Sequence, residues 1–191
     1  MISSNLFAAY LLGFMLALTP VSKHAYYEKE SVTTFRYIDI AQTIADVVMT
    51  EKMADDALVK VGAVMVSIGD AESGGWRADV VSCAKGGDND MSWGPWQTQL
   101  PKAQVCEGTK SAARLALGMV KRSFLICKDL PSADRLSWYT DGGAWNASAD
   151  RKARSRKRSN FRMNRALSWV AQHPFTVNVD SLNTPVIFEA P

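Results

Sequence analysis

One glutamate of the chain stands where a helix would hold it against an apolar surface. Apolar residues recur every three or four positions before it, as on one face of an α-helix, at Leu58, Val61, Met65 and Ile68. The next position of that series is Glu72. Burial and the negative end of the helix dipole both disfavour a charged carboxylate, so we expect a raised pKa, as a general acid requires. The alternative from periodicity is that Glu72 lies one turn past the core and points into water.

Two further motifs follow the Glu-Ser pair at residues 72–73. A Ser-x-Gly-x-x-Gln turn runs from Ser92 to Gln97, about twenty residues later, and a Tyr-x-x-Gly motif begins at Tyr139. The three motifs, in this order, resemble those of the lysozyme-like lytic transglycosylases and related phage and bacterial peptidoglycan hydrolases. The resemblance covers residues 72–142.

This resemblance implies an all-α, lysozyme-like domain with a long ordered groove loop or a small hairpin. It implies an enzyme, a lytic transglycosylase or a lysozyme-type muramidase, that cleaves the β-1,4 bond between the amino sugars of peptidoglycan with Glu72 as proton donor. We expect no cofactor, and no His/Cys/Asp cluster has the spacing of metal ligands. The resemblance assigns the sugar groove to Ser73, Asp88, Ser92, Trp96, Gln97 and Tyr139.

The groove residues also have structural interpretations. The two serines can make local cap or turn hydrogen bonds, and Gln97 can close its own loop. Trp96 and Tyr139 can pack in the core instead of contacting sugar. The sequence leaves open whether a second carboxylate takes part in catalysis, because most glycosidases use two carboxylates and many lytic transglycosylases use one.

Three cysteines are present, so at least one is unpaired. The resemblance implies a disulfide between Cys83 and Cys106, which bracket the Ser-x-Gly-x-x-Gln segment, and leaves Cys127 alone. The alternative is three reduced thiols that pack as small apolar residues.

Positive charge is concentrated in residues 151–165. This run holds eight of the 22 Lys and Arg and no acid, so the other 14 are outnumbered by the 19 Asp and Glu. It is either a solvated helix face or a surface that binds an anionic wall or membrane. We do not expect nucleic acid as a partner, because no reader motif accompanies the charge. The candidate contacts are Arg151, Arg154, Arg156 and Arg158.

The first 25 residues contain an uninterrupted apolar run at 6–18, followed by Thr19 and Pro20. Its length is typical of a signal-peptide core and short for a membrane span. We therefore expect a signal peptide or N-terminal anchor, with a helix of a virion or a helix buried in the fold as alternatives. The protein would be secreted or periplasmic, or virion-associated if it is phage-encoded.

The rest of the chain divides into a polar linker, a helical domain and a tail. We expect the linker at 26–36, the catalytic domain at 37–173 and the tail at 174–191. Within the domain, expected helices are 37–51, 54–71, 109–127, 132–139 and 147–172. A rival to the enzyme is a non-catalytic wall- or virion-binding protein that adheres through the basic run.

Overall fold

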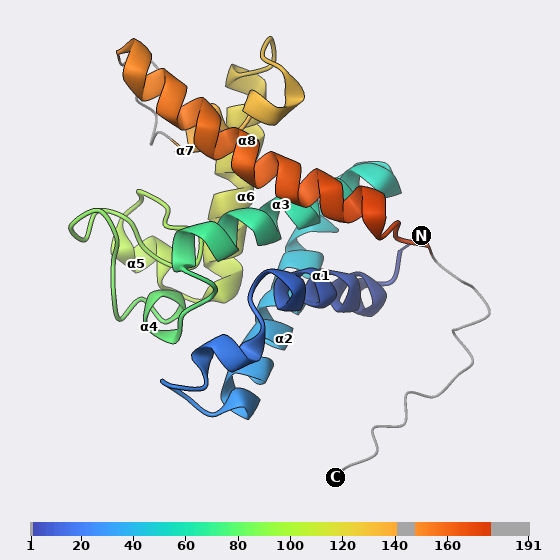
Figure 1. The fold of residues 1–191 in the computed structure, drawn as a ribbon, viewed down its shortest axis with the longest axis vertical. Coiled ribbons are helices and arrows are strands. Elements are labelled where there is room, and N and C mark those ends of the chain that lie inside the picture. The colour runs from blue at the N-terminus through green and yellow to red at the C-terminus, as the bar shows by residue number, and fades with distance from the viewer. Residues whose placement is uncertain (1, 141–147, 177–191) are drawn as a thin grey trace.

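The computed structural model describes residues 2–140 and 148–176, and it is all-α (Figure 1). Between residues 2 and 140 and between 148 and 176, β-structure is limited to two isolated bridges, Gly87 with Ser92 and Trp93 with Thr98. The all-α class is thus confirmed. The helices are α1 (Ser4–Leu18), η1 (Val21–His24), α2 (Glu30–Val48), α3 (Asp55–Ser73), α4 (Ala78–Val81), α5 (Lys102–Val105), α6 (Thr109–Ile126), η2 (Ser132–Asp134), α7 (Ser137–Thr140) and α8 (Ala149–Gln172).

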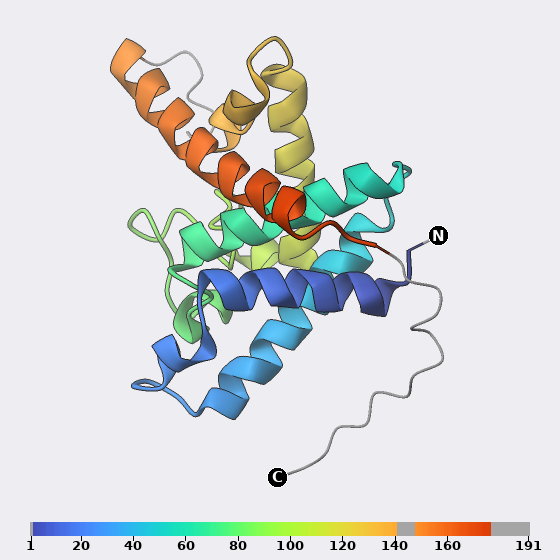
Figure 2. The same ribbon diagram turned by 45° about the vertical axis from the view of Figure 1, so that its right-hand side comes forward.

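Helix α3 is the centre of the molecule. In both ribbon views it lies between α1 and α8 (Figures 1 and 2). Most of its length is buried, and even its polar residues Ser67 and Asp70 are inside. Two glycines permit this packing. A Cβ on Gly62 would stand 2.5 Å from the Phe7 ring, and one on Gly69 would stand 2.1 Å from the Trp76 indole.

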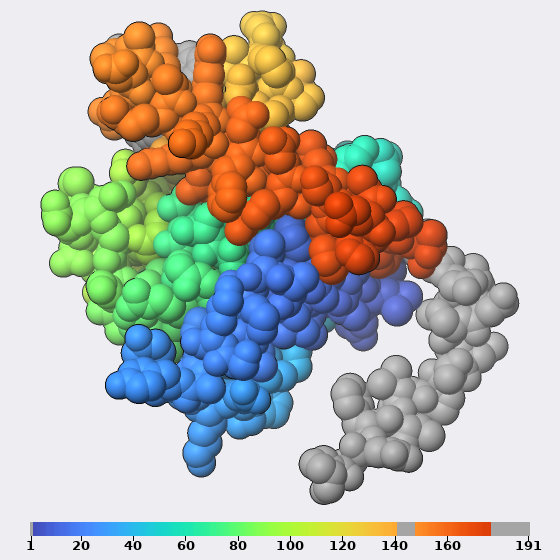
Figure 3. Space-filling model, in the orientation of Figure 1, coloured from blue at the N-terminus to red at the C-terminus, as the bar shows by residue number. Residues whose placement is uncertain are grey.

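Helix α1 is an integral part of this core. Phe7, Leu11, Phe14 and Met15 are fully or almost fully buried. The Phe14 ring stacks on Trp169 of α8 with 4.9 Å between centroids. Figure 3 shows α8, in orange and red, lying across the blue N-terminal part of the chain.

Beyond the end of α1, a buried polar network also connects the N-terminal segment to α3 and α8. Thr19 Oγ1 donates a hydrogen bond to Asp70 Oδ1 at 2.6 Å, and Arg165 Nη1 of α8 donates to Asp70 Oδ2 at 2.8 Å. The segment expected to be a leader therefore holds the end of α3 in place. The buried-helix alternative describes α1 in this structure, while processing as a signal peptide stays a prediction. None of the helices that the structure describes is long and apolar enough to cross a membrane.

The expected linker at 26–36 is largely helical, because α2 begins at Glu30 and not near residue 37. Its first turns extend beyond the core and leave Val32 and Phe35 exposed, so no apolar periodicity marks them. Arg36 pairs with Glu28 and its Nε donates to the carbonyl of Trp76 at 3.0 Å. These contacts attach the polar segment to the residues that follow α3.

The long ordered loop predicted at residues 73–108 extends over 74–101 in the structure, because α5 begins at Lys102, and it contains the short helix α4 and the two bridges. Six of its non-glycine residues have positive φ, among them Asp88 and Gln97. The Cys83–Cys106 disulfide is present, with 5.9 Å between the Cα atoms. Cys127 is free and buried. The disulfide joins the loop to the end of α5, just before α6.

Candidate active site

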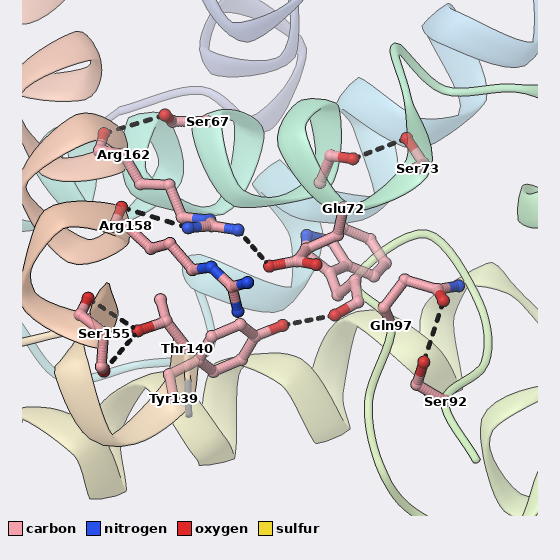
Figure 4. Close-up of polar contacts among 12 residues, drawn as sticks. Ser67, Glu72, Ser73, Ser92, Gln97, Tyr139, Thr140, Ser155, Arg158 and Arg162 are labelled. Atoms are coloured by element: carbon pink, nitrogen blue, oxygen red, sulfur yellow. Dashed lines mark hydrogen bonds and ion pairs between the residues drawn. The ribbon is translucent and has the colours of Figure 1, made fainter. Parts of the chain in front are cut away.

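Glu72 lies in the last turn of α3, which ends at Gly74 in the left-handed conformation (φ 65°). Its side chain is 24% exposed, so the apolar stripe does carry it to the edge of the core and not into open water. The carboxylate accepts a hydrogen bond from Arg162 Nη2 of α8, with Glu72 Oε1 at 2.5 Å (Figure 4). The site is therefore built between the end of one helix and the middle of another.

Arg162 belongs to the buried face of α8. That face carries Ser155, Ser159, Arg162, Met163 and Ala166. The Arg162 side chain is 9% exposed, and its Nη1 also donates to the carbonyl of Arg158 at 3.1 Å. The backbone carbonyl of Arg162 accepts from Ser67 Oγ of α3 at 2.8 Å. These contacts fix the register of α8 on α3 and hold the guanidinium against Glu72.

The electrostatic environment of Glu72 combines opposing effects. Burial raises the pKa of the Glu72 carboxyl above its ordinary value, and the Arg162 and Arg158 guanidinium groups partly offset that increase. The negative charge of Asp88 raises the pKa slightly further. The expectation of a raised pKa is therefore met, with burial as its main cause.

Tyr139 of α7 is buried close to Glu72 (Figure 4). Its hydroxyl donates to the backbone carbonyl of Trp96 at 2.6 Å. Burial raises the pKa of Tyr139 well above its ordinary value, and the charge of Glu72 adds to the effect. Tyr139 thus joins α7 to the loop at residues 74–101. Gly142, the last residue of its motif, lies outside the described residues.

Four of the six expected groove residues are buried: Tyr139, Ser92, and the two described here, Trp96 and Ser73. Trp96 is 1% exposed, and its indole N–H donates to the carbonyl of Met65 at 2.9 Å. Ser73 is also buried; its hydroxyl donates to the Gly69 carbonyl at 2.6 Å and accepts from the Trp76 backbone N–H. In this structure Trp96 anchors the loop on α3 and Ser73 caps α3, so neither faces a groove.

Ser92 and Gln97 hold the loop closed. Ser92 Oγ is 3.0 Å from Gln97 Oε1 and 3.3 Å from Asp88 Oδ2, and Gln97 Nε2 donates to the Gly94 carbonyl at 2.9 Å. A Cβ on Gly87 would stand 2.0 Å from Gln97 Oε1, so a glycine is required beside this amide. Ser92 is buried and Gln97 half-buried, whereas Asp88 is exposed. Of the three, Asp88 has the most exposed side chain.

A cavity of about 410 Å³ separates this loop from the first half of α8. Two of its lining residues, Arg158 and Asp88, lie close enough to Glu72 to shift its pKa, although Glu72 does not line the cavity itself. In Figure 4 the Arg158 side chain extends alongside that of Arg162 toward Glu72 and Tyr139. The lining consists of Asp88, Asn89, Met91, Gln99, Thr140, Arg151, Arg154, Ser155 and Arg158.

Sequence reasoning missed the role of Arg162. The basic run was interpreted as a solvated or adhesive face, and most of its charges are indeed exposed. Arg162 falls on the same helical face as Met163 and Ala166, which are buried. That register was the available signal for an inward-facing arginine.

Metal ligation has no support in the described ranges, which contain no group of three His, Cys, Asp or Glu residues arranged to hold an ion.

Comparisons of the chain with protein-family models, with curated proteins and with solved structures find no match. A functional proposal therefore depends on the motifs of the sequence and on the geometry around Glu72.

Proposed function

We propose that the protein is a lysozyme-like glycosidase that cleaves the β-1,4 bond between N-acetylmuramic acid and N-acetylglucosamine in peptidoglycan. The observation that carries the proposal is the position of Glu72: it ends a buried helix, has a raised pKa and lies close to Tyr139. A shielded carboxyl group with a raised pKa suits proton delivery to a glycosidic oxygen. The ordered motifs of the sequence supply the substrate class.

In this proposal the proton of Glu72 passes to the leaving oxygen as the glycosidic bond breaks. The carboxylate that remains is stabilised by Arg162, whose guanidinium already donates to Glu72 Oε1. A sugar chain bound over the site would exclude water and favour the protonated form of Glu72 beforehand.

The second step depends on whether another carboxylate takes part. Asp88 is the exposed acid whose charge already influences Glu72. If Asp88 assists, water would be admitted and the products would carry reducing ends. If only Glu72 acts, the substrate's acetamido group would assist and an anhydro ring would close. The products distinguish these routes.

The test is digestion of purified peptidoglycan by the full chain, with products identified by mass spectrometry. We expect the wild type to release muropeptides and Glu72→Gln to release none. Glu51→Gln is a matched control, because Glu51, like Glu72, is about one quarter exposed (23%) and pairs with a basic residue, Lys121, at 2.6 Å. It differs in position, since it lies on the connection between α2 and α3. The control should keep full activity.

The glycosidase proposal is overturned if the wild-type protein releases no muropeptides, or if the Glu72→Gln variant stays active. Binding without cleavage would instead favour the second candidate, a non-catalytic wall- or virion-binding protein. The arginine-lined cavity is the observation on which that candidate depends. In either case the target polymer lies outside the cytoplasmic membrane, so we propose a secreted, periplasmic or virion location.

A further inference from the structure

The cavity between the loop at residues 74–101 and α8 is rich in arginine. Of the nine described residues that line it, three are arginines, and Asp88 is the acid among those nine. Asp88 is already engaged, because its Oδ2 is within 3.5 Å of Ser92 Oγ and of Gln99 Nε2. Among the described lining residues, arginines therefore outnumber acids.

Arg154 and Arg158 stand four residues apart on one face of α8, so their guanidinium groups are directed to the same region. Over the ranges 2–140 and 148–176, neither side chain forms an ion pair with an acid. Two neighbouring like charges raise the energy of the unliganded protein, and an anion placed between them lowers it. A planar carboxylate matches the donor geometry of a guanidinium group.

The base of the cavity is held by hydrogen bonds between α7 and α8. Thr140 Oγ1 donates to the Ser155 carbonyl at 3.1 Å and lies 2.9 Å from Ser155 Oγ. Ser155 Oγ in turn donates to the Ser137 carbonyl. The turn of α8 between the two arginines is therefore fixed on α7, the helix that also carries Tyr139.

The cavity lies beside Glu72, since Arg158 both lines it and acts on the Glu72 pKa. In peptidoglycan a peptide stem with free carboxylates is attached to every second sugar, next to a cleavable bond. We propose that the cavity is a subsite in which Arg154 and Arg158 bind a carboxylate of this peptide stem. The inference rests on the proposed function, because it takes peptidoglycan as the polymer that Glu72 meets.

The test measures cosedimentation of the full chain with insoluble peptidoglycan, in the Glu72→Gln background so that the polymer stays intact. The polymer is first stripped of phosphate-bearing wall polymers, which leaves stem carboxylates as its anions. We expect the added double substitution Arg154→Gln/Arg158→Gln to weaken binding about tenfold or more, since charge-assisted hydrogen bonds are lost. On insoluble peptidoglycan whose stem carboxylates have been coupled to methylamine with a carbodiimide, which removes their charge and keeps the stems, the same substitutions should change nothing.

The matched control is Arg156→Gln/Lys157→Gln, which removes the same charge from the same turn of α8 at exposed positions outside the cavity. Equal weakening by this pair would overturn the proposal, because net charge alone would then explain the loss. So would unchanged binding of the cavity variant, equal loss on the methylamine-coupled polymer, or a defect seen only when phosphate polymers are present. Because no cleavage is required, stem-dependent binding by a protein without activity would refute the glycosidase and leave the subsite intact.

Discussion

At the scale of single residues, the pairing of Glu72 with Arg162 is the feature that most affects the proposed chemistry. A general acid must hold a proton, and an arginine at hydrogen-bonding distance opposes this by stabilising the charged form. Burial acts in the other direction and is the larger effect. Arg162 thus limits how far the Glu72 pKa rises, and it fixes the direction of the carboxylate.

We predict that Arg162→Met shifts the pH dependence of activity. In the proposed mechanism the protonated form of Glu72 is the active one, so activity should fall as pH rises through its pKa. Removal of the guanidinium takes away an effect that lowers this pKa, so the descending limb of kcat/KM should move to higher pH. The measurement is a pH profile of kcat/KM on soluble glycan strands.

Arg162→Lys keeps a positive charge and should leave the descending limb near its wild-type pH. If Arg162→Met lowered activity at every pH without moving the limb, Arg162 would act through packing alone. That result would contradict the electrostatic role assigned to it.

The sequence could predict a site residue only where local periodicity determines whether its side chain points into the core or into solvent. Glu72 could be placed at the core edge because its register follows from its own helix. Trp96 could not, because its loop has no period, and only the tertiary structure shows its indole N–H bonded to the Met65 carbonyl. The Glu72–Arg162 contact joins residues 90 positions apart, so it follows from helix packing and not from any local pattern.

At the scale of elements, the loop after α3 depends on a covalent tie. The Cys83–Cys106 disulfide spans 23 positions and encloses both bridges of the loop. Such a closure restricts the unfolded chain, and for a loop of this length it contributes about 3 kcal/mol to the free energy of unfolding.

We predict that Cys83→Ser/Cys106→Ser lowers the free energy of unfolding in urea by about 3 kcal/mol. The residues that position Asp88 lie in the released loop, so activity should fall as well. Cys127→Ser changes a free, buried cysteine and should not reproduce the loss of activity. A double variant as stable as the wild type would show that the loop is held by its hydrogen bonds and by Trp96.

The main helices could be predicted from periodicity and their ends. The expected ranges 54–71 and 109–127 agree closely with α3 (Asp55–Ser73) and α6 (Thr109–Ile126). The start of α2 was missed because its first turns face solvent on most sides and carry no apolar stripe. The expected helix 132–139 is two shorter pieces, η2 and α7, because residues 135–136 form a turn between them.

At the scale of the whole molecule, the N-terminal apolar helix is part of the core. Its length and composition suggested a leader, because an apolar run of this kind is shared by signal peptides and buried helices. Sequence alone could not separate the two, since the difference lies in the partners that α1 meets on α2, α3 and α8.

We predict that Phe7→Ala lowers the free energy of unfolding by about 3–5 kcal/mol, because it opens a cavity against Gly62 of α3. The measurement is urea unfolding followed by circular dichroism. Leu16→Ala on the same helix is the control: Leu16 is 38% exposed and its loss should cost far less. A chain lacking residues 1–25 should fail to fold, and that result would also argue against removal of this segment as a signal peptide. If the shortened chain melted like the full one, α1 would be dispensable and its assignment to the core would be wrong.

The contact of α1 with the last described residues has a consequence for biosynthesis. Tyr10 of α1 packs edge-on against Phe175, with 5.3 Å between ring centroids. The ribosome adds on the order of 5–20 residues per second, so α1 is made roughly 10 to 30 seconds before this partner emerges. During that interval the most apolar helix of the chain has no complete docking surface. Nascent chains stalled before α8 should therefore be cut by protease within α1 or recruit chaperones there, while the released protein resists.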